Sequence, residues 1–234
     1  MPATIRLLCT TALKTTIDEL MPAFERDTGH KLVAAYGPSA QLTKRLTDGE
    51  PADAVVLTGP GLDEMTKLGK VAAASRIDIA SSQTMVAVKQ GTPKPDISTV
   101  EAFKQAMLAA KSIAYSGPGS GASGAHVAKV FEHLGIADAV RSKAVLGPGG
   151  PAGLIGNYLV RGKAEIGMQQ DAELMMVPGV DIVGPMPPGI GLTTVFAFGI
   201  TTAAADGGAG RALGPFLRTP AARALLQAKG LKPA

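Results

Sequence analysis

Two loops of small residues, 36–39 (YGPS) and 116–124 (SGPGSGASG), each stand between a predicted strand and a predicted helix. A helix start carries unpaired backbone N–H groups and partial positive charge, so such loops bind carboxylates, phosphates and other oxyanions readily. The hydroxyls of Ser39, Ser120 and Ser123 stand at these helix starts. Each hydroxyl either donates to a ligand or caps a backbone N–H. The sequence therefore predicts a small-anion site.

The second loop also satisfies the pattern G-x-G-x-x-G at residues 119–124. This pattern marks dinucleotide-binding proteins when an acidic residue follows it by about 20 positions. Asp138 comes too early to fill that place, and the loop lies in the middle of the chain. A small-anion loop is the favoured interpretation, with a purely structural glycine turn and a dinucleotide site as its alternatives.

Outside the two loops, the sequence contains no complete catalytic or metal-binding motif. No two of the three histidines have metal-ligand spacing, so the sequence predicts neither a metal site nor a cofactor. His126 follows the glycine-rich loop and is a candidate acid or base, with simple packing as the alternative. Lys14 could reach an anion from the start of its helix or be solvated there. Neither a serine-hydrolase elbow nor a Walker A motif occurs.

Composition narrows the class of protein. The chain has 234 residues, 46% of them hydrophobic, which is enough to form the core of one two-lobed domain or two small ones. Its formal net charge is +4. With six Phe, three Tyr and no Trp, the chain has few rings to stack on bases, so nucleic acid is not expected as a partner. The single Cys9 excludes an internal disulfide and is expected to pack as a small apolar residue.

Hydropathy predicts neither a membrane span nor a leader. No run approaches the roughly 20 apolar residues that a spanning helix needs, and no charged segment followed by an apolar one opens the chain. We therefore expect no membrane insertion. The expected location is the cytoplasm for the chain as it stands, or the periplasm if a leader has been removed.

Short β-rich runs alternate with helix-length segments, which predicts an α/β fold built on parallel strands. Pro22 falls inside the first helical pattern, where a bend or break is expected. Two segments, 81–84 and 184–190, are predicted to cross between lobes, giving one lobe of residues 1–83 plus 190–234 and another of 84–189. A double crossing forms a hinge, with a ligand cleft between the lobes. The expected strands are 4–8, 31–35, 54–57, 85–88, 112–115, 165–168, 180–184 and 193–200, and the expected helices 16–26, 39–48, 100–110, 124–134 and 221–228.

Several short motifs share the order and spacing of a known family: LCTTAL at 8–13, FERDTG at 24–29, YGPS at 36–39, PAD at 51–53, LGI at 134–136 and AEIG at 164–167. Together they resemble the periplasmic molybdate-binding proteins, the type II solute-binding proteins of ABC importers. The resemblance runs along nearly the whole chain. It implies a two-lobed type II periplasmic-binding-protein fold, each lobe a mostly parallel sheet flanked by helices, and an ABC permease as partner if the protein is exported.

The resemblance also implies where a ligand would bind. In the family an oxyanion is held by serine hydroxyls, backbone amides and a tyrosine hydroxyl. The two serine positions fall on Ala12 and Ser39, the amide positions near Ser123 and Ala152, and the tyrosine position on Gln170. Thr10, Thr11 and Ser120 complete the candidate ligand-binding set.

Two hydroxyl donors of the family are thus absent, which favours an organic polycarboxylate over molybdate or tungstate. The chain also resembles a divergent branch of the superfamily that includes aconitate isomerase. That branch implies an alternative function, the cofactor-independent isomerisation of a tricarboxylate, with His126, Lys14 or Tyr115 as candidate bases.

Overall fold

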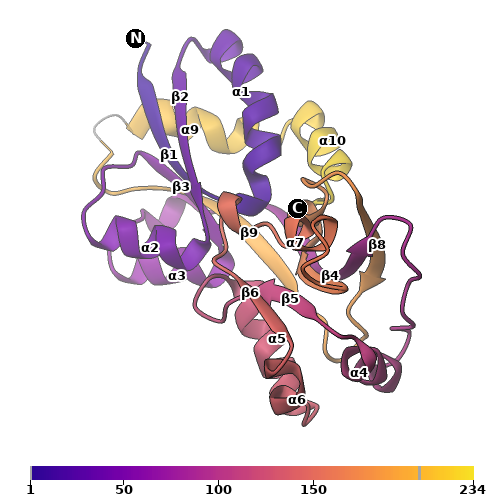
Figure 1. Ribbon diagram of the computed structural model, residues 1–234. Coiled ribbons are helices and arrows are strands. Elements are labelled where there is room, and N and C mark those ends of the chain that lie inside the picture. The colour runs from indigo at the N-terminus through magenta and orange to yellow at the C-terminus, as the bar shows by residue number, and fades with distance from the viewer. Residues whose placement is uncertain (1, 205–206) are drawn as a thin grey trace. The chain divides into compact units, whose positions relative to one another are not determined.

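Strands and helices alternate along almost the whole computed structural model, which describes residues 2–204 and 207–234 (Figure 1). The α/β class expected from the sequence is confirmed. The strands are β1 (Thr4–Thr10), β2 (Lys31–Gly37), β3 (Ala54–Thr58), β4 (Ile77–Lys89), β5 (Ile113–Ser116), β6 (Ala144–Gly147), β7 (Ile166–Gln170), β8 (Val180–Pro185), β9 (Thr193–Ile200) and β10 (Lys232–Pro233). The helices are α1 (Lys14–Thr28), α2 (Ser39–Thr47), α3 (Gly59–Lys67), α4 (Val100–Ala109), α5 (Ala122–His133), α6 (Ala137–Arg141), α7 (Gly156–Val160), α8 (Asp171–Leu174), α9 (Gly207–Phe216) and α10 (Pro220–Ala228), with short 3-10 helices at Thr11–Leu13, Ala73–Ser75 and Pro151–Gly153.

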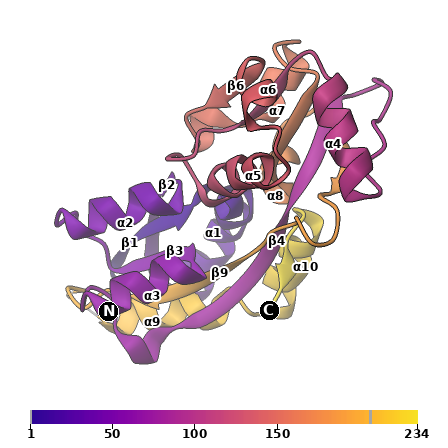
Figure 2. The same cartoon turned by 90° about the horizontal axis from the view of Figure 1, so that it is seen from below.

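The chain forms two compact units, one of Met1–Ser81 with Thr194–Ala234 and one of Ser82–Thr193. The sequence-based expectation put the corresponding boundaries at 83/84 and 189/190. β4 belongs to both units, because the first ends and the second begins within this long strand (Figure 2).

The first unit is built on three neighbouring parallel strands in the order β2-β1-β3. β9 then pairs antiparallel with β3, which makes the sheet mixed. Leu8 and Val55 point to the face covered by α2 and α3. On α1, Phe24 packs edge-on against Phe216 of α9 at a centroid distance of 5.2 Å. Cys9 is completely buried, as a small apolar residue would be, and it forms no disulfide.

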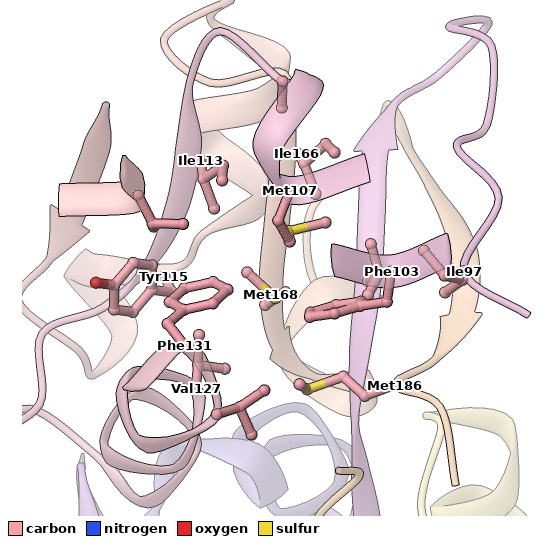
Figure 3. Close-up of a cluster of buried hydrophobic side chains, with 14 of the residues drawn as sticks. Ile97, Phe103, Met107, Ile113, Tyr115, Val127, Phe131, Ile166, Met168 and Met186 are labelled. Carbon is pink, nitrogen blue, oxygen red and sulfur yellow. The ribbon is translucent and has the colours of Figure 1, made fainter. Parts of the chain in front are cut away.

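The second unit repeats this plan with parallel strands in the order β6-β5-β7. β4 pairs antiparallel with β7 and with β8. Its main core lies between the sheet and helices α4 and α5 (Figure 3). The residues labelled there are Ile97, Phe103, Met107, Ile113, Tyr115, Val127, Phe131, Ile166, Met168 and Met186.

Of the bend or break predicted at Pro22, the break does not occur, because α1 continues through this residue from Lys14 to Thr28. Proline removes the hydrogen bond that would reach the carbonyl of Asp18. Pro22 lies on the exposed side of the helix, where water can hydrate that carbonyl. Packing of Ile17, Leu20 and Phe24 on the opposite side holds the helix together.

Candidate functional site

In the first unit, the predicted ligand residues gather at one edge of the sheet. The carboxyl ends of neighbouring parallel strands meet at a common edge, and ligands of α/β proteins bind at such edges. Thr10 ends β1 and is followed by Thr11 and Ala12 in a 3-10 helix, and Ser39 starts α2 directly after β2. All four residues are buried. The Thr11 hydroxyl has no hydrogen-bond partner in the part of the chain that the structure describes.

Ser39 does not cap its helix. Pro38 takes the cap position, and the Ser39 Oγ instead accepts two hydrogen bonds from Thr58, from its backbone N–H at 2.9 Å and from its Oγ1 at 3.2 Å. Thr58 is the last residue of β3 and was not predicted as a site residue. Because the oxygen of Ser39 accepts both bonds, its own proton is left to donate elsewhere.

In the second unit, the predicted residues again lie at or after the ends of three neighbouring parallel strands. Ser120 and Ser123 follow β5, Ala152 follows β6, and Gln170 is the last residue of β7. Ser123 and Gln170 are buried, Ser120 is half-buried and Ala152 is exposed. Ala152 borders a polar pocket of about 120 Å³, whose other lining residues are Asn157, Tyr158, Arg161 and Lys163.

The start of α5 has the features of an anion site. Gly121 occupies the cap position, and no side chain caps the helix. The N–H groups of the first turn, including that of Ser123, have no acceptor within the helix. Gly124 is required sterically, because a Cβ there would lie 2.1 Å from the Ser116 carbonyl oxygen. A Cβ added at Gly119 or Gly121 would meet no atom within 4 Å, so only the last glycine of the pattern is needed for close packing of the helix on its strand.

His126 lies one turn after Ser123 on α5 and is half-buried. Its Nε2 lies 2.7 Å from the carbonyl oxygen of Ile190. A carbonyl can only accept, so Nε2 carries a proton and the neutral ring presents Nδ1 as its basic atom. This arrangement fixes the tautomer of His126 and leaves one nitrogen for acid–base chemistry.

Lys14 and Tyr115 are less suited to act as bases. Lys14 pairs with Asp18, and its Nζ lies 4.9 Å above the ring of Tyr36, whose hydroxyl donates to Asp18 at 2.5 Å. Tyr115 packs in the core edge-on to Phe131, with its hydroxyl at the margin of the cluster (Figure 3). Burial raises the pKa of Tyr115, which keeps its hydroxyl protonated.

Glu173, which the sequence did not single out, is a buried carboxyl three residues after Gln170. Burial raises the pKa of Glu173 from 4.5 to about 7, while hydrogen bonds from the Gln170 backbone and the Gln169 side chain act in the opposite direction. The bond to the Gln170 N–H is the one that an acidic residue makes at the third position of a helix. Gln169 also accepts from the Ile155 N–H at 2.7 Å.

Among the described residues, no group of three or more His, Cys, Asp or Glu side chains could hold a metal ion. Within the same ranges, no helix is both long and apolar enough to cross a bilayer.

A family model described as bacterial extracellular solute-binding protein matches residues 5–232. The chain belongs to this family. It is 37% identical over 236 residues to an aconitate isomerase from a Pseudomonas species, covering 98% of this chain and 88% of that protein. It is 25% identical over 219 residues to the molybdate-binding protein ModA of Azotobacter vinelandii, covering 91% of this chain and 83% of that one.

The fold agrees with this assignment. The solved periplasmic molybdate-binding protein of Azotobacter vinelandii superposes with a TM-score of 0.78 at 21% identity, covering 97% of this chain and 98% of that one. The resemblance to the molybdate-binding proteins and their fold, inferred from the motifs, is therefore confirmed.

Proposed function

We propose that this solute-binding protein family member binds an unsaturated tricarboxylate such as aconitate and interconverts its cis and trans isomers without a cofactor. The observation that carries the proposal is the 37% identity to an aconitate isomerase over 98% of the chain. The neutral donors at the two carboxyl edges support it, because hydroxyls and amides can hold several carboxylates in defined positions.

The reaction needs only proton transfer. Aconitate has a methylene group beside its double bond, and removal of one methylene proton spreads the charge over the allyl system and its carboxylates. Return of a proton to the other end of that system moves the double bond, and either isomer can form. One C–H bond breaks and one forms, so neither an oxidant nor a reductant is required. The protein must supply an acid–base group and donors to the developing charge.

We assign the acid–base role to His126. Its Nδ1 is the basic atom of the neutral ring because Nε2 donates to the Ile190 carbonyl. It stands one helical turn from Ser123, whose N–H belongs to the proposed anion-binding turn. His126→Gln should keep the Nε2-like donor and remove the base, lowering kcat about 100-fold or more. His133→Gln, an exposed change on the same helix, is the matched control.

In this proposal, the residues at the carboxyl edge of each unit donate hydrogen bonds to carboxylate groups. The set is the one that the resemblance implied: Thr10, Thr11, Ala12, Ser39, Ser120, Ser123, Ala152 and Gln170. The small side chain of Ala12 leaves space, and the Gln170 amide supplies both a donor and an acceptor. The proposal also includes a hinge movement of the chain at the crossings 81–84 and 184–190.

A second candidate function is binding of a small anion for import, with an ABC permease as partner. The observations in its favour are the family match over residues 5–232 and the identity to ModA. This candidate function requires export of the protein to the periplasm. Because Ala12 and Gln170 replace two hydroxyl donors of the molybdate-binding pattern, a polycarboxylate suits this site better than molybdate does.

Proton NMR of trans-aconitate mixed with the purified protein tests the enzyme directly, and appearance of the cis isomer is expected. A thermal-shift series with molybdate, tungstate, sulfate, citrate and both aconitates identifies the ligand class. Ligand at a hundredfold its Kd should stabilise the protein by about 2.7 kcal/mol. Binding of polycarboxylates without turnover would favour the second candidate, and a response to molybdate or tungstate alone would overturn both polycarboxylate proposals.

A further inference from the structure

Thr84 on β4 is almost completely buried, with 1% of its surface exposed. Its hydroxyl has no hydrogen-bond partner within residues 2–204 and 207–234. A buried hydroxyl is normally paired, so an unpaired one calls for an explanation. From this and from the position of Thr84 opposite Gln170, we infer that Thr84 is a further ligand-binding residue that acts with Gln170 on one carboxylate of the ligand. The inference rests on the proposed function.

The register brings the two side chains close together. Thr84 is paired with Gln170 in the antiparallel ladder of β4 and β7. The backbone groups of Thr84 bond elsewhere, its N–H to Leu192 at 2.9 Å and its carbonyl to the N–H of Met186 at 3.3 Å. Thr84 and Gln170 are therefore a non-hydrogen-bonded pair, in which the Cα atoms lie about 4.5 Å apart and the side chains are closest.

The pair stands where an apolar face of the sheet ends. Val86, two residues after Thr84, pairs with Met168, two residues before Gln170, in the same ladder. Both belong to the core that Val127 of α5 covers, and Figure 3 labels Met168 and Val127. Side chains two residues apart share a face of a strand, so Thr84 and Gln170 continue this face at the carboxyl end of β7. This is the edge that carries the other proposed ligand residues of the second unit.

A cross-strand Thr–Gln pair suits a carboxylate. Neighbouring Cβ atoms of such a pair are about 4.5–5.5 Å apart, so a hydroxyl and an amide can each donate to one of the two carboxylate oxygens. Ser82, two residues before Thr84, is also buried, and its hydroxyl likewise lacks a partner in the described ranges. It extends the same row of neutral donors.

Three variants test the inference. Thr84→Val keeps the shape and removes the hydroxyl, Thr84→Ser keeps the hydroxyl, and Thr43→Val is the matched control. The Thr43 hydroxyl is also buried, but it donates to the Ala40 carbonyl at 2.9 Å. Isothermal titration calorimetry measures Kd for tricarballylate, a saturated tricarboxylate that cannot isomerise, and thermal melts report stability without ligand.

Thr84→Val should weaken tricarballylate binding about tenfold or more without lowering the melting temperature, and Thr84→Ser should stay within threefold of wild type. Thr43→Val should lower the melting temperature and leave Kd unchanged. The inference is overturned if Thr84→Val binds tricarballylate with the same Kd as wild type, or if Thr84→Val and Thr84→Ser lose the same affinity. Wild-type protein that binds tricarballylate but does not isomerise trans-aconitate overturns only the isomerase. Absence of tricarboxylate binding overturns the proposed function and the role of Thr84 with it.

Discussion

Replacement of Ser39 by Ala tests the anion site at its best-defined donor. The Ser39 Oγ accepts hydrogen bonds from the N–H and the Oγ1 of Thr58. Its own proton is therefore available to a ligand. A hydrogen bond to a charged group contributes about 1.5–3 kcal/mol, so Ser39→Ala should raise Kd for a carboxylate ligand roughly 10- to 150-fold.

The same change has a separate cost in stability. The Thr58 N–H loses its acceptor, and a buried unpaired donor costs about 1–3 kcal/mol. In a chain of this size, each kcal/mol lowers the melting temperature by about 2–4 °C. A fall of several degrees is therefore expected in addition to the loss of affinity.

Ser75→Ala is the matched control, because Ser75 Oγ accepts from the Ile200 N–H at 2.8 Å and is not a proposed ligand residue. Calorimetry with tricarballylate and thermal melts of the unliganded proteins give the two readouts. Ser75→Ala should lose stability and keep its affinity. If Ser39→Ala loses stability but binds within twofold of wild type, Ser39 is a structural residue and the argument from its free proton is wrong.

Three further predictions concern stability. Because Glu173 keeps its proton up to about pH 7 when folded but only to about 4.5 when unfolded, the free energy of unfolding should fall by up to about 3 kcal/mol as pH rises through this window. Chemical denaturation at several pH values measures the fall, and Glu173→Gln should abolish it. Gly124→Ala should lower the free energy of unfolding, followed by thermal melts, by about 3 kcal/mol because its Cβ would clash with the Ser116 carbonyl. Gly121→Ala should change it little. Asp53 accepts hydrogen bonds from Arg6 Nε at 3.0 Å and Nη2 at 3.1 Å, which lowers the pKa of Asp53. Asp53→Asn should therefore lower the free energy of unfolding by about 2 kcal/mol at pH 7. The difference between variant and wild type should shrink below about pH 4, as the wild-type carboxylate is protonated.

The sequence predicted β1, β2, β5 and β7, which carry candidate site residues, because their apolar runs are short and bounded by small residues. Residues 193–200 were expected as a strand and form β9 with the same bounds. β6 was missed: its four residues include the exposed Leu146, so no buried run or clean alternation marks it. β4 is much longer than the predicted 85–88, because Ser82, Gln83 and Thr84 are polar and the pattern breaks there.

The site was predicted where ligand residues lie at the end of a strand, as Gln170 does, or just after one, as Ser39 does. Thr58 and Thr84 were missed for a physical reason. Thr58 approaches Ser39 only through the pairing of β1 with both β2 and β3, and Thr84 meets Gln170 only through the register of β4 with β7. Pairing between distant segments leaves no local signal in a single sequence.

The charge of the proposed donors bears on how the site would select its ligand. Ser39, Thr84 and Gln170 are neutral, and Lys14, the first cation after β1, is already paired with Asp18. Long-range attraction between free charges is screened by salt, whereas short hydrogen bonds to a desolvated anion are screened much less. An anion held in this way is selected by the positions of its oxygen atoms rather than by its total charge. The affinity of such a site should therefore depend only weakly on ionic strength, and a polycarboxylate of the wrong shape should bind poorly even when its charge is the same.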